Sequence, residues 1–171
     1  MNSPQYKNGD YKEYFRYDSK LVFGFFEQYR YLSNFHLCKV MWDGVEWPSS
    51  EHAYMAAKCA NTSFNVFGEK IYSANTNRQL AEASCSFIKK WGQEVVLRPD
   101  WEDVKVEIMT SILYSKFLEN EELRERLVAT GERKLIEANS WGDAYWGYDV
   151  RRDCGMNMLG EILMTVRSQL S

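Results

Sequence analysis

Glu51 and Lys58 are the two residues whose types and spacing first suggest chemistry. They lie seven residues apart in a segment that begins with Pro48, Ser49 and Ser50, a combination typical of a helix start. Seven residues make almost two turns, so both side chains would leave one helix face, with Cα atoms roughly 10 Å apart along the axis. A carboxylate and an amine that reach one ligand can do acid–base and nucleophilic chemistry. The alternative is an ordinary solvated helix face.

Two tryptophans in polar surroundings, Trp101 and Trp146, are candidates for stacking on a planar ligand. The alternative for each is packing over the edge of the core. Asp143 stands three residues before Trp146, in a segment rich in glycine and aromatic residues. Desolvation by rings can change the proton affinity of a carboxylate, as a catalytic acid requires. The other interpretation of Asp143 is an Asx turn that shapes the loop.

The segment before the last predicted helix is a candidate anion site. Gly155 and Asn157 belong to the turn that opens this helix, where backbone amides without helical partners attract anions. Arg151 and Arg152 precede the turn and would strengthen the attraction for phosphate. The alternative is a glycine-containing loop with solvated arginines.

Composition narrows the class of protein. The chain has 171 residues, of which 45% are hydrophobic and 26% charged, and its net charge is −3. These values predict an ordinary soluble globular protein without a whole-molecule field that favours nucleic acid. There is no apolar run of the ~20 residues that a membrane helix needs, and no signal peptide is recognisable at the start. The four cysteines and two histidines lack metal-site spacing, so we expect no metal, no cofactor and a cytoplasmic location.

The hydrophobic pattern predicts an α+β fold: a compact, predominantly helical single domain with a small β-sheet or hairpin. Residues 1–20 are polar with interspersed tyrosines and are predicted to be an N-terminal extension, and residues 21–171 to be the domain. Asp43-Gly44 predicts a hairpin turn. Helices are expected from Ser50 to about residue 60, from about residue 75, from a cap at Asp100, from about residue 120, and from about residue 157 to residue 170.

Short motifs along the chain match, in order, those of the NADAR superfamily, also called YbiA-like. The sequence resembles this family from about residue 23 to residue 170. Any single motif is weak evidence, but about ten in the correct order are specific. The matching pieces include residues 25–27, 32–35, 43–48, 51–52, 57–58, 98–101, 116–117, 143–147 and 155–160.

The resemblance implies a largely helical α+β domain and an N-glycosidase that cuts the bond between ribose C1′ and a nitrogen. Two substrate classes are known in the family. One is the ribosylaminopyrimidine phosphates of the early riboflavin pathway, and the other is ADP-ribose attached to guanine bases of nucleic acid. The family residues associated with the active site match Glu51, Lys58, Trp101, Asp143 and Trp146.

Two routes for the reaction stay open. Water adds to C1′ with Glu51 or Asp143 as base, or Lys58 attacks C1′ of the opened sugar and forms a Schiff base. Trp101 and Trp146 would stack on the base, and Asp143 would orient a ribose hydroxyl or protonate the leaving nitrogen. Further substrate contacts are expected from Ser33, Asn34, Arg151, Gly155 and Asn157.

The sequence also departs from the family pattern. Met55 stands where many members carry glutamine, Ala83-Ser84-Cys85 replaces a frequent Gly-Arg pair, and Asp149 stands where glycine is common. One extra residue lies between Glu137 and Asp143. These departures near the expected ligand rim bear on the substrate more than on the reaction.

Two other classes of function compete with an enzyme. A non-catalytic reader of ADP-ribose or a related nucleotide would bind tightly without turnover, but would not need Glu51, Lys58 and Asp143 together. An interaction domain is suggested only by the tyrosine-rich first 20 residues. The expected partners are a ribosylated nucleobase or nucleotide and ADP-ribosylated nucleic acid, with no membrane.

Overall fold

The computed structural model describes residues 15–58, 82–94 and 97–171. The chain forms two compact units, and each is described by itself. The terminal unit combines residues 1–33 with 127–169 and 171, and the central unit comprises residues 34–126 and 170. Within the described residues, long helices accompany short strands, which confirms the predicted α+β class.

A three-stranded sheet lies at the core of the terminal unit. Its middle strand β2 (Leu21–Phe23) pairs antiparallel with β1 (Arg16–Tyr17) and parallel with β5 (Lys134–Ile136). Val22 and Leu135 are partners in this register, and both are completely buried. β1 lies within the segment predicted to be an N-terminal extension, so the sheet begins before the predicted start of the domain.

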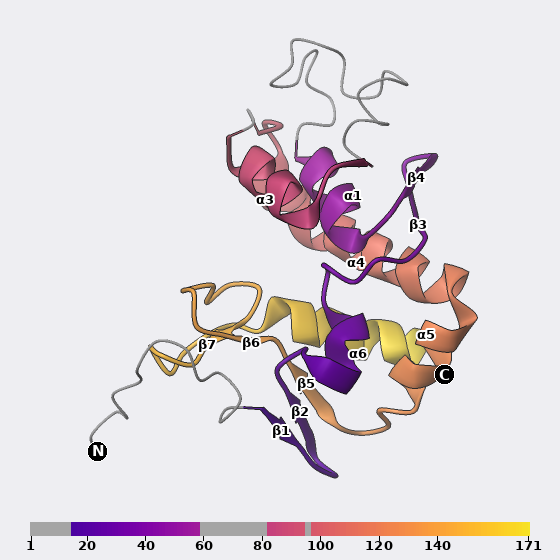
Figure 1. Cartoon of the computed structure of the whole chain (residues 1–171), viewed down its shortest axis with the longest axis vertical. Helices are drawn as coiled ribbons and strands as arrows, with labels where there is room; N and C mark the ends of the chain where they lie inside the picture. Colours follow the sequence, from indigo (N-terminus) through magenta and orange to yellow (C-terminus); the bar gives the residue numbers. More distant parts are fainter. Residues whose placement is uncertain (1–14, 59–81, 95–96) are drawn as a thin grey trace. The chain divides into compact units, whose positions relative to one another are not determined.

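A second small sheet of the terminal unit holds the loop that carries Asp143 and Trp146. β6 (Ala138–Asn139) and β7 (Tyr148–Asp149) form its two strands and pair in parallel. The two helices that complete the description of this unit are the 3-10 helix η2 (Glu27–Leu32) and α6 (Met158–Leu170), which is the yellow helix in Figure 1.

Asn157 fixes the start of α6. Its backbone is left-handed, with φ 54° and ψ 37°, a conformation that asparagine tolerates better than most residues. Its Nδ2 donates to the Leu135 carbonyl at 2.9 Å, and its Oδ1 accepts from the Glu137 amide at 2.9 Å. At Gly160, a Cβ would lie 2.1 Å from the Leu135 carbonyl oxygen. The helix therefore joins the sheet through backbone contacts that need asparagine and glycine.

The central unit begins with the hairpin that the sequence predicts. β3 (Val40–Trp42) and β4 (Val45–Trp47) pair antiparallel. The turn residues Asp43 and Gly44 have φ of 50° and 73°. Two positive φ values are what a type I′ turn requires, and its twist matches that of the strands. Because α1 follows β4 almost directly, this hairpin sets where the helix of Glu51 begins.

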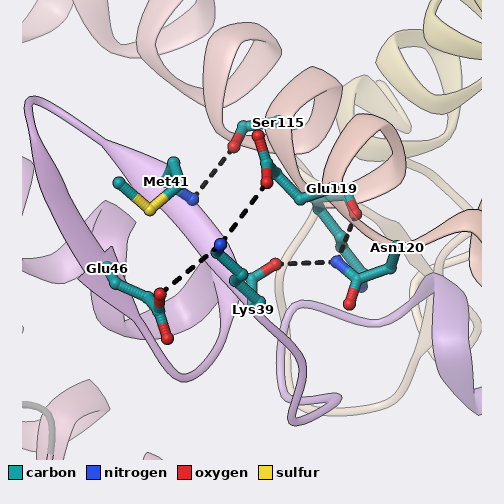
Figure 2. Close-up of polar contacts among 7 residues, drawn as sticks. Lys39, Met41, Glu46, Ser115, Glu119 and Asn120 are labelled. Carbon is teal, nitrogen blue, oxygen red and sulfur yellow. Dashed lines mark hydrogen bonds and ion pairs between the residues drawn. The ribbon is translucent and has the colours of Figure 1, made fainter.

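Polar contacts attach the hairpin to the last turns of α4 (Trp101–Glu119), as Figure 2 shows. The Met41 amide donates to Ser115 Oγ at 2.9 Å. Asn120 Nδ2 donates to the Lys39 carbonyl at 2.7 Å, and Lys39 Nζ lies 3.6 Å from a carboxylate oxygen of Glu119. Exposed ion pairs contribute little stability, so the two backbone bonds give this junction its register.

Helix α1 (Ser50–Ala57) packs on both α3 (Cys85–Glu94) and α4 (Figure 1). Every residue of α1 is buried, so this helix has no solvated face. The predicted continuation of α1 to about residue 60 and the predicted helix start near residue 75 lie outside the described residues. The described helix that follows α4 is α5 (Glu121–Val128).

The prediction that the Asp100 side chain caps α4 is wrong. Asp100 occupies the N-cap position, but its carboxylate makes no bond to the helix amides. Instead it accepts two hydrogen bonds from the Arg98 guanidinium, at 2.5 and 2.8 Å. These bonds lower the pKa of the Asp100 carboxyl. A planar guanidinium two residues away satisfies both carboxylate oxygens at once, which a cap bond would not do.

Candidate functional site

Glu51 lies in the first turn of α1 and is only 5% exposed. The helix start is built as predicted, since the Ser49 hydroxyl at the N-cap accepts from the His52 amide at 3.3 Å. The Glu51 amide donates to the Asn34 carbonyl at 3.0 Å. This bond brings together two residues that the sequence assigns to the site. A carboxylate near a helix N-terminus is also stabilised by the helix dipole.

Lys58 is the C-cap of α1 and retains helical backbone angles, with φ −57° and ψ −34°. Its Nζ donates to the Gly92 carbonyl at 2.9 Å. This carbonyl belongs to the last turn of α3, where carbonyl groups lack helical partners and a cation is favoured. The contact therefore stabilises the protonated amine. A reaction that uses Lys58 as a nucleophile must first break it.

Gly92 of α3 lies close to Met55 of α1. A Cβ at Gly92 would lie 2.1 Å from Met55 Sδ, so a larger residue at this position would require the flexible end of the Met55 side chain to move. Met55 is one of the positions where the sequence departs from the family pattern.

Three buried polar atoms in the central unit have no hydrogen-bond partner among the described residues: Asn34 Oδ1, Ser50 Oγ and Trp91 Nε1. Ser50 directly precedes Glu51, and the Asn34 carbonyl binds the Glu51 amide. Trp91 directly precedes Gly92. Leaving a buried polar group without a partner costs about 1–3 kcal/mol, and such groups ask for an explanation. The three groups belong to residues that are next in the chain to Glu51 and Gly92 or that contact Glu51, and a polar ligand would satisfy them.

His52 is a residue of this site that sequence reasoning did not assign. Its ring lies between Ser49 Oγ, at 2.7 Å from Nδ1, and the Ala83 carbonyl, at 2.9 Å from Nε2. The carbonyl can only accept, so Nε2 carries the proton and Nδ1 accepts from Ser49. Burial lowers the pKa of His52. The sequence feature that could have indicated this contact is Ser49, a helix-cap residue three positions before His52.

Trp101 belongs to the same unit as Glu51 and Lys58. It is the first residue of α4 and is 5% exposed. Its ring packs against Tyr54 of α1, with ring centroids 5.0 Å apart and planes at 50°. Trp101 thus connects α4 to the middle of α1, and its predicted stacking on a base stays a prediction.

Asp143 and Trp146 lie in the terminal unit, in the loop between β6 and β7. Asp143 Oδ1 accepts from the amides of Tyr145 at 3.2 Å and Trp146 at 2.9 Å. This is the Asx turn that the sequence left as one interpretation. Asp143 Oδ2 makes no hydrogen bond within the described part of the chain, and the catalytic role of Asp143 stays a prediction.

The other predicted substrate contacts of the terminal unit have different surroundings. The Asn157 amide is used by the backbone of Leu135 and Glu137, and Gly155 lies where a Cβ would come 2.3 Å from the Gly147 carbonyl oxygen. These contacts give both residues a structural function. Ser33 is buried and follows η2, whereas Arg151 is exposed. Binding of substrate by these four residues stays a prediction.

Among residues 15–58, 82–94 and 97–171, no three His, Cys, Asp or Glu side chains lie together so that they could hold a metal ion. No helix among the described residues is both long and apolar enough to cross a bilayer.

Comparisons with known proteins agree with this fold and these motifs. The chain matches the NADAR domain family over residues 14–171. It is 39% identical over 144 residues to the riboflavin biosynthesis protein VVA0006 of Vibrio vulnificus, a match that covers 84% of this chain and 36% of that protein. The chain therefore spans only about a third of the Vibrio protein.

Smaller relatives match over most of their length. The chain is 35% identical over 145 residues to the N-glycosidase YbiA of Escherichia coli (strain K12), which covers 85% of this chain and 84% of YbiA. The NMR structure of Escherichia coli YbiA superimposes with a TM-score of 0.70 and 30% identity, covering 92% of this chain and 88% of that one. The chain therefore belongs to the NADAR domain family and is an enzyme of the N-glycosidase class.

Proposed function

We propose that this enzyme hydrolyses the bond between ribose C1′ and a base nitrogen in ADP-ribosylated guanine of nucleic acid. The alternative substrate class is the ribosylaminopyrimidine phosphates of riboflavin synthesis. The observation that carries the proposal is the buried Glu51 carboxylate at one end of α1 and the Lys58 amine at the other, together with buried polar atoms of Asn34, Ser50 and Trp91 that have no partner among the described residues. A cytoplasmic location belongs to the same proposal.

Glu51 would act on the charge that develops as the glycosidic bond breaks. The C1′–N bond breaks with its electron pair going to the base nitrogen, which takes up a proton, and C1′ becomes oxocarbenium-like. A buried carboxylate stabilises this cation strongly, because the surrounding protein screens charge less than water does. In the direct route, water then adds to C1′ and gives its proton to a carboxylate, for which Glu51 and Asp143 are the candidates.

Lys58 offers the second route. The sugar ring opens, the Lys58 amine adds to C1′, and the base leaves, so that an imine joins Nζ to the sugar. Water then hydrolyses the imine and releases both the sugar and the amine. Only a neutral amine is nucleophilic, so this route needs Lys58 to leave the Gly92 carbonyl and lose a proton. The contact with the Gly92 carbonyl favours the protonated amine, which can act only through its positive charge. A substrate would have to displace this contact before Lys58 could attack C1′.

Roles for the remaining residues are carried by the family resemblance. Trp101 and Trp146 would hold the base by stacking. Asp143 would orient a ribose hydroxyl or protonate the leaving nitrogen through Oδ2, since Oδ1 already accepts two loop amides. Ser33, Asn34 and Arg151 would supply further polar contacts to the sugar and phosphate.

The test is incubation of the full chain with an oligonucleotide that carries ADP-ribose on guanine and, separately, with a ribosylaminopyrimidine phosphate. Release of ADP-ribose together with an unmodified oligonucleotide is the expected result. Release of base from the pyrimidine substrate alone would place the enzyme in the second substrate class. Binding of both substrates without any release would overturn the proposal and make the chain a reader of ribosylated nucleotides.

Borohydride trapping separates the two routes. If Lys58 forms an imine, reduction during turnover attaches the sugar to the protein, and mass spectrometry locates the added mass on Lys58. Lys58→Ala would then be inactive and Lys58→Arg, which keeps the charge, would not rescue it. An active wild-type enzyme that never traps, together with an active Lys58→Arg variant, would exclude the Schiff base.

A further inference from the structure

Cys85 lies in a cluster of polar groups of the central unit. It is the first residue of α3, and its side chain is partly exposed. Its Sγ lies 3.8 Å from Ser49 Oγ, 4.0 Å from His52 Nδ1 and 3.8 Å from the Phe35 carbonyl oxygen. A thiol, a hydroxyl and an imidazole within hydrogen-bond reach of one another are the parts of an activated nucleophile. None of the three has a step in the proposed reaction.

A proton can pass from the Cys85 thiol to the His52 ring through Ser49. The Ser49 hydroxyl donates to His52 Nδ1 at 2.7 Å, because the proton on Nε2 is directed to the Ala83 carbonyl at 2.9 Å. Ser49 Oγ can accept the thiol proton while it gives its own to Nδ1. Burial lowers the pKa of His52, so the resting ring is neutral at about pH 7 and able to accept.

Two further features around Cys85 favour a negatively charged sulfur. Ser84 caps α3, since its Oγ accepts from the Phe87 amide at 3.3 Å, and Cys85 therefore lies at the positive end of the helix dipole. Lys89 follows one turn later on the same face of α3, with its Nζ 5.5 Å from the centre of the Phe35 ring. Reactive cysteines occupy such positively charged, partly exposed positions.

The other two cysteines among the described residues lack these surroundings. Cys38 Sγ donates to the His36 carbonyl at 3.7 Å, and burial raises the pKa of the Cys38 thiol, which disfavours the reactive thiolate. Cys154 is exposed but has no hydrogen-bonded imidazole in the described part of the chain. The protein therefore contains its own controls for Cys85.

We infer that Cys85 is a site of reversible oxidation, at which a peroxide converts the thiol to a sulfenic acid. The sulfur attacks one peroxide oxygen, so an S–O bond forms and the O–O bond breaks. Sulfur is oxidised by two electrons and the peroxide is reduced. The leaving hydroxide takes the proton that His52 accepted and becomes water. A dithiol such as dithiothreitol reverses the change, since it reduces the sulfenic acid to the thiol and water and becomes a disulfide.

Oxidation of Cys85 would reach the start of α1. The added oxygen would compete for the Ser49 hydroxyl, which caps α1 and binds His52. Glu51 lies between these two residues in the sequence, so we expect the oxidised enzyme to turn over more slowly. This effect on turnover rests on the proposed function, whereas the oxidation itself does not. The segment Ala83-Ser84-Cys85 is also one of the departures from the family pattern.

The test exposes the full chain to a limited amount of hydrogen peroxide in the presence of dimedone, which forms a stable thioether with a sulfenic acid. Mass spectrometry then locates the label. We expect Cys85 to be labelled at least about tenfold faster than Cys38 and Cys154. His52→Gln should slow the labelling of Cys85 at least about tenfold, and Lys89→Gln about threefold.

Matched variants complete the design. Lys90→Gln changes an exposed lysine on another face of α3 and should be labelled like the parent. Cys85→Ser should take no label at this position and keep its glycosidase activity in peroxide. The parent should lose activity in peroxide and regain it with dithiothreitol. Circular dichroism checks that the variants fold, and the comparison of the three cysteines within the parent needs no variant.

Equal labelling of the three cysteines, or unchanged labelling of Cys85 in a folded His52→Gln variant, would overturn the inference. Full activity after labelling would overturn the effect on α1. A chain that is labelled in the expected pattern but cleaves no glycoside would keep the oxidation site and remove the proposed reaction. A chain that cleaves but takes no label at Cys85 would do the reverse.

Discussion

Polar groups at the start of α1 and in the loop between β6 and β7 differ in their hydrogen-bond partners. Around Glu51, the buried oxygen atoms of Ser50 and the Asn34 side chain have no partner among the described residues. In the loop region, Asp143 Oδ1 and both ends of the Asn157 amide bind the backbone. The first arrangement leaves polar groups that a ligand would satisfy, whereas the second stabilises the fold. The comparison teaches that a residue's membership of a family motif does not by itself distinguish these functions.

The largest expected effect is on catalysis at α1. Glu51→Gln keeps the size of the side chain and removes its charge, so kcat should fall on the order of 10²-fold or more. The rate of base release on either substrate measures this. Glu46→Gln is the matched control, since this carboxylate is 63% exposed on β4 and should leave the rate unchanged. A near-normal rate in Glu51→Gln would remove this residue from the mechanism.

A large effect on stability is expected at Asn157. Asn157→Ala removes the bonds to the Leu135 carbonyl and the Glu137 amide and places alanine at a positive φ. The free energy of unfolding should fall on the order of 3 kcal/mol, as urea denaturation would measure. Asn157→Gly relieves the backbone but loses the same bonds, so most of the loss should remain. If stability stays unchanged while KM rises, Asn157 is a substrate contact after all.

Ser50→Ala tests whether the polar group at the start of α1 serves a ligand rather than the fold. The Ser50 hydroxyl is completely buried and has no partner among the described residues, so its removal should raise the free energy of unfolding on the order of 1 kcal/mol. The KM for substrate should rise. The neighbouring Ser49→Ala loses the helix cap and the His52 bond and should cost about 1–2 kcal/mol. A Ser50 variant as unstable as the Ser49 variant would show that the hydroxyl serves the fold.

The smallest expected effect is the pH dependence that His52 gives to the same helix start. Burial lowers the pKa of His52 below its ordinary 6.5, so the unfolded chain takes up a proton at a higher pH than the folded chain does. The contribution of His52 to stability is therefore fully present above the ordinary pKa of 6.5. It is lost as the pH falls from there through the lowered pKa of the folded chain. Urea denaturation at about pH 7.5 and about pH 5.5 should show the loss. His52→Gln should reduce this difference in the free energy of unfolding between the two pH values. An equal difference in the parent and the variant would show that His52 is not its source.

Local sequence signals predicted the elements that depend on local chemistry. Asp43-Gly44 predicted the hairpin because few residue pairs tolerate two positive φ values, and Ser49 predicted the start of α1 because its hydroxyl caps the helix. The Asp100 cap failed because Arg98 competes for the same carboxylate. Such competition depends on side-chain geometry, which residue type alone does not express.

The contacts of the candidate site were less predictable, because they join segments far apart in the sequence. The spacing of Glu51 and Lys58 predicted their helix, but nothing in it pointed to Gly92, which receives the lysine. Trp141 received no role because the residues around it lie far apart in the sequence. Its environment arises only when Phe15, Phe26 and Val150 come together in the folded unit.

The bond between Lys58 Nζ and the Gly92 carbonyl would make one amine serve both the proposed reaction and the architecture of α3. An adduct on this nitrogen would remove the bond to the final turn of α3, and the amide hydrogens of that turn would then exchange faster with deuterated solvent. Exchange at α3 would in this way report the state of Lys58.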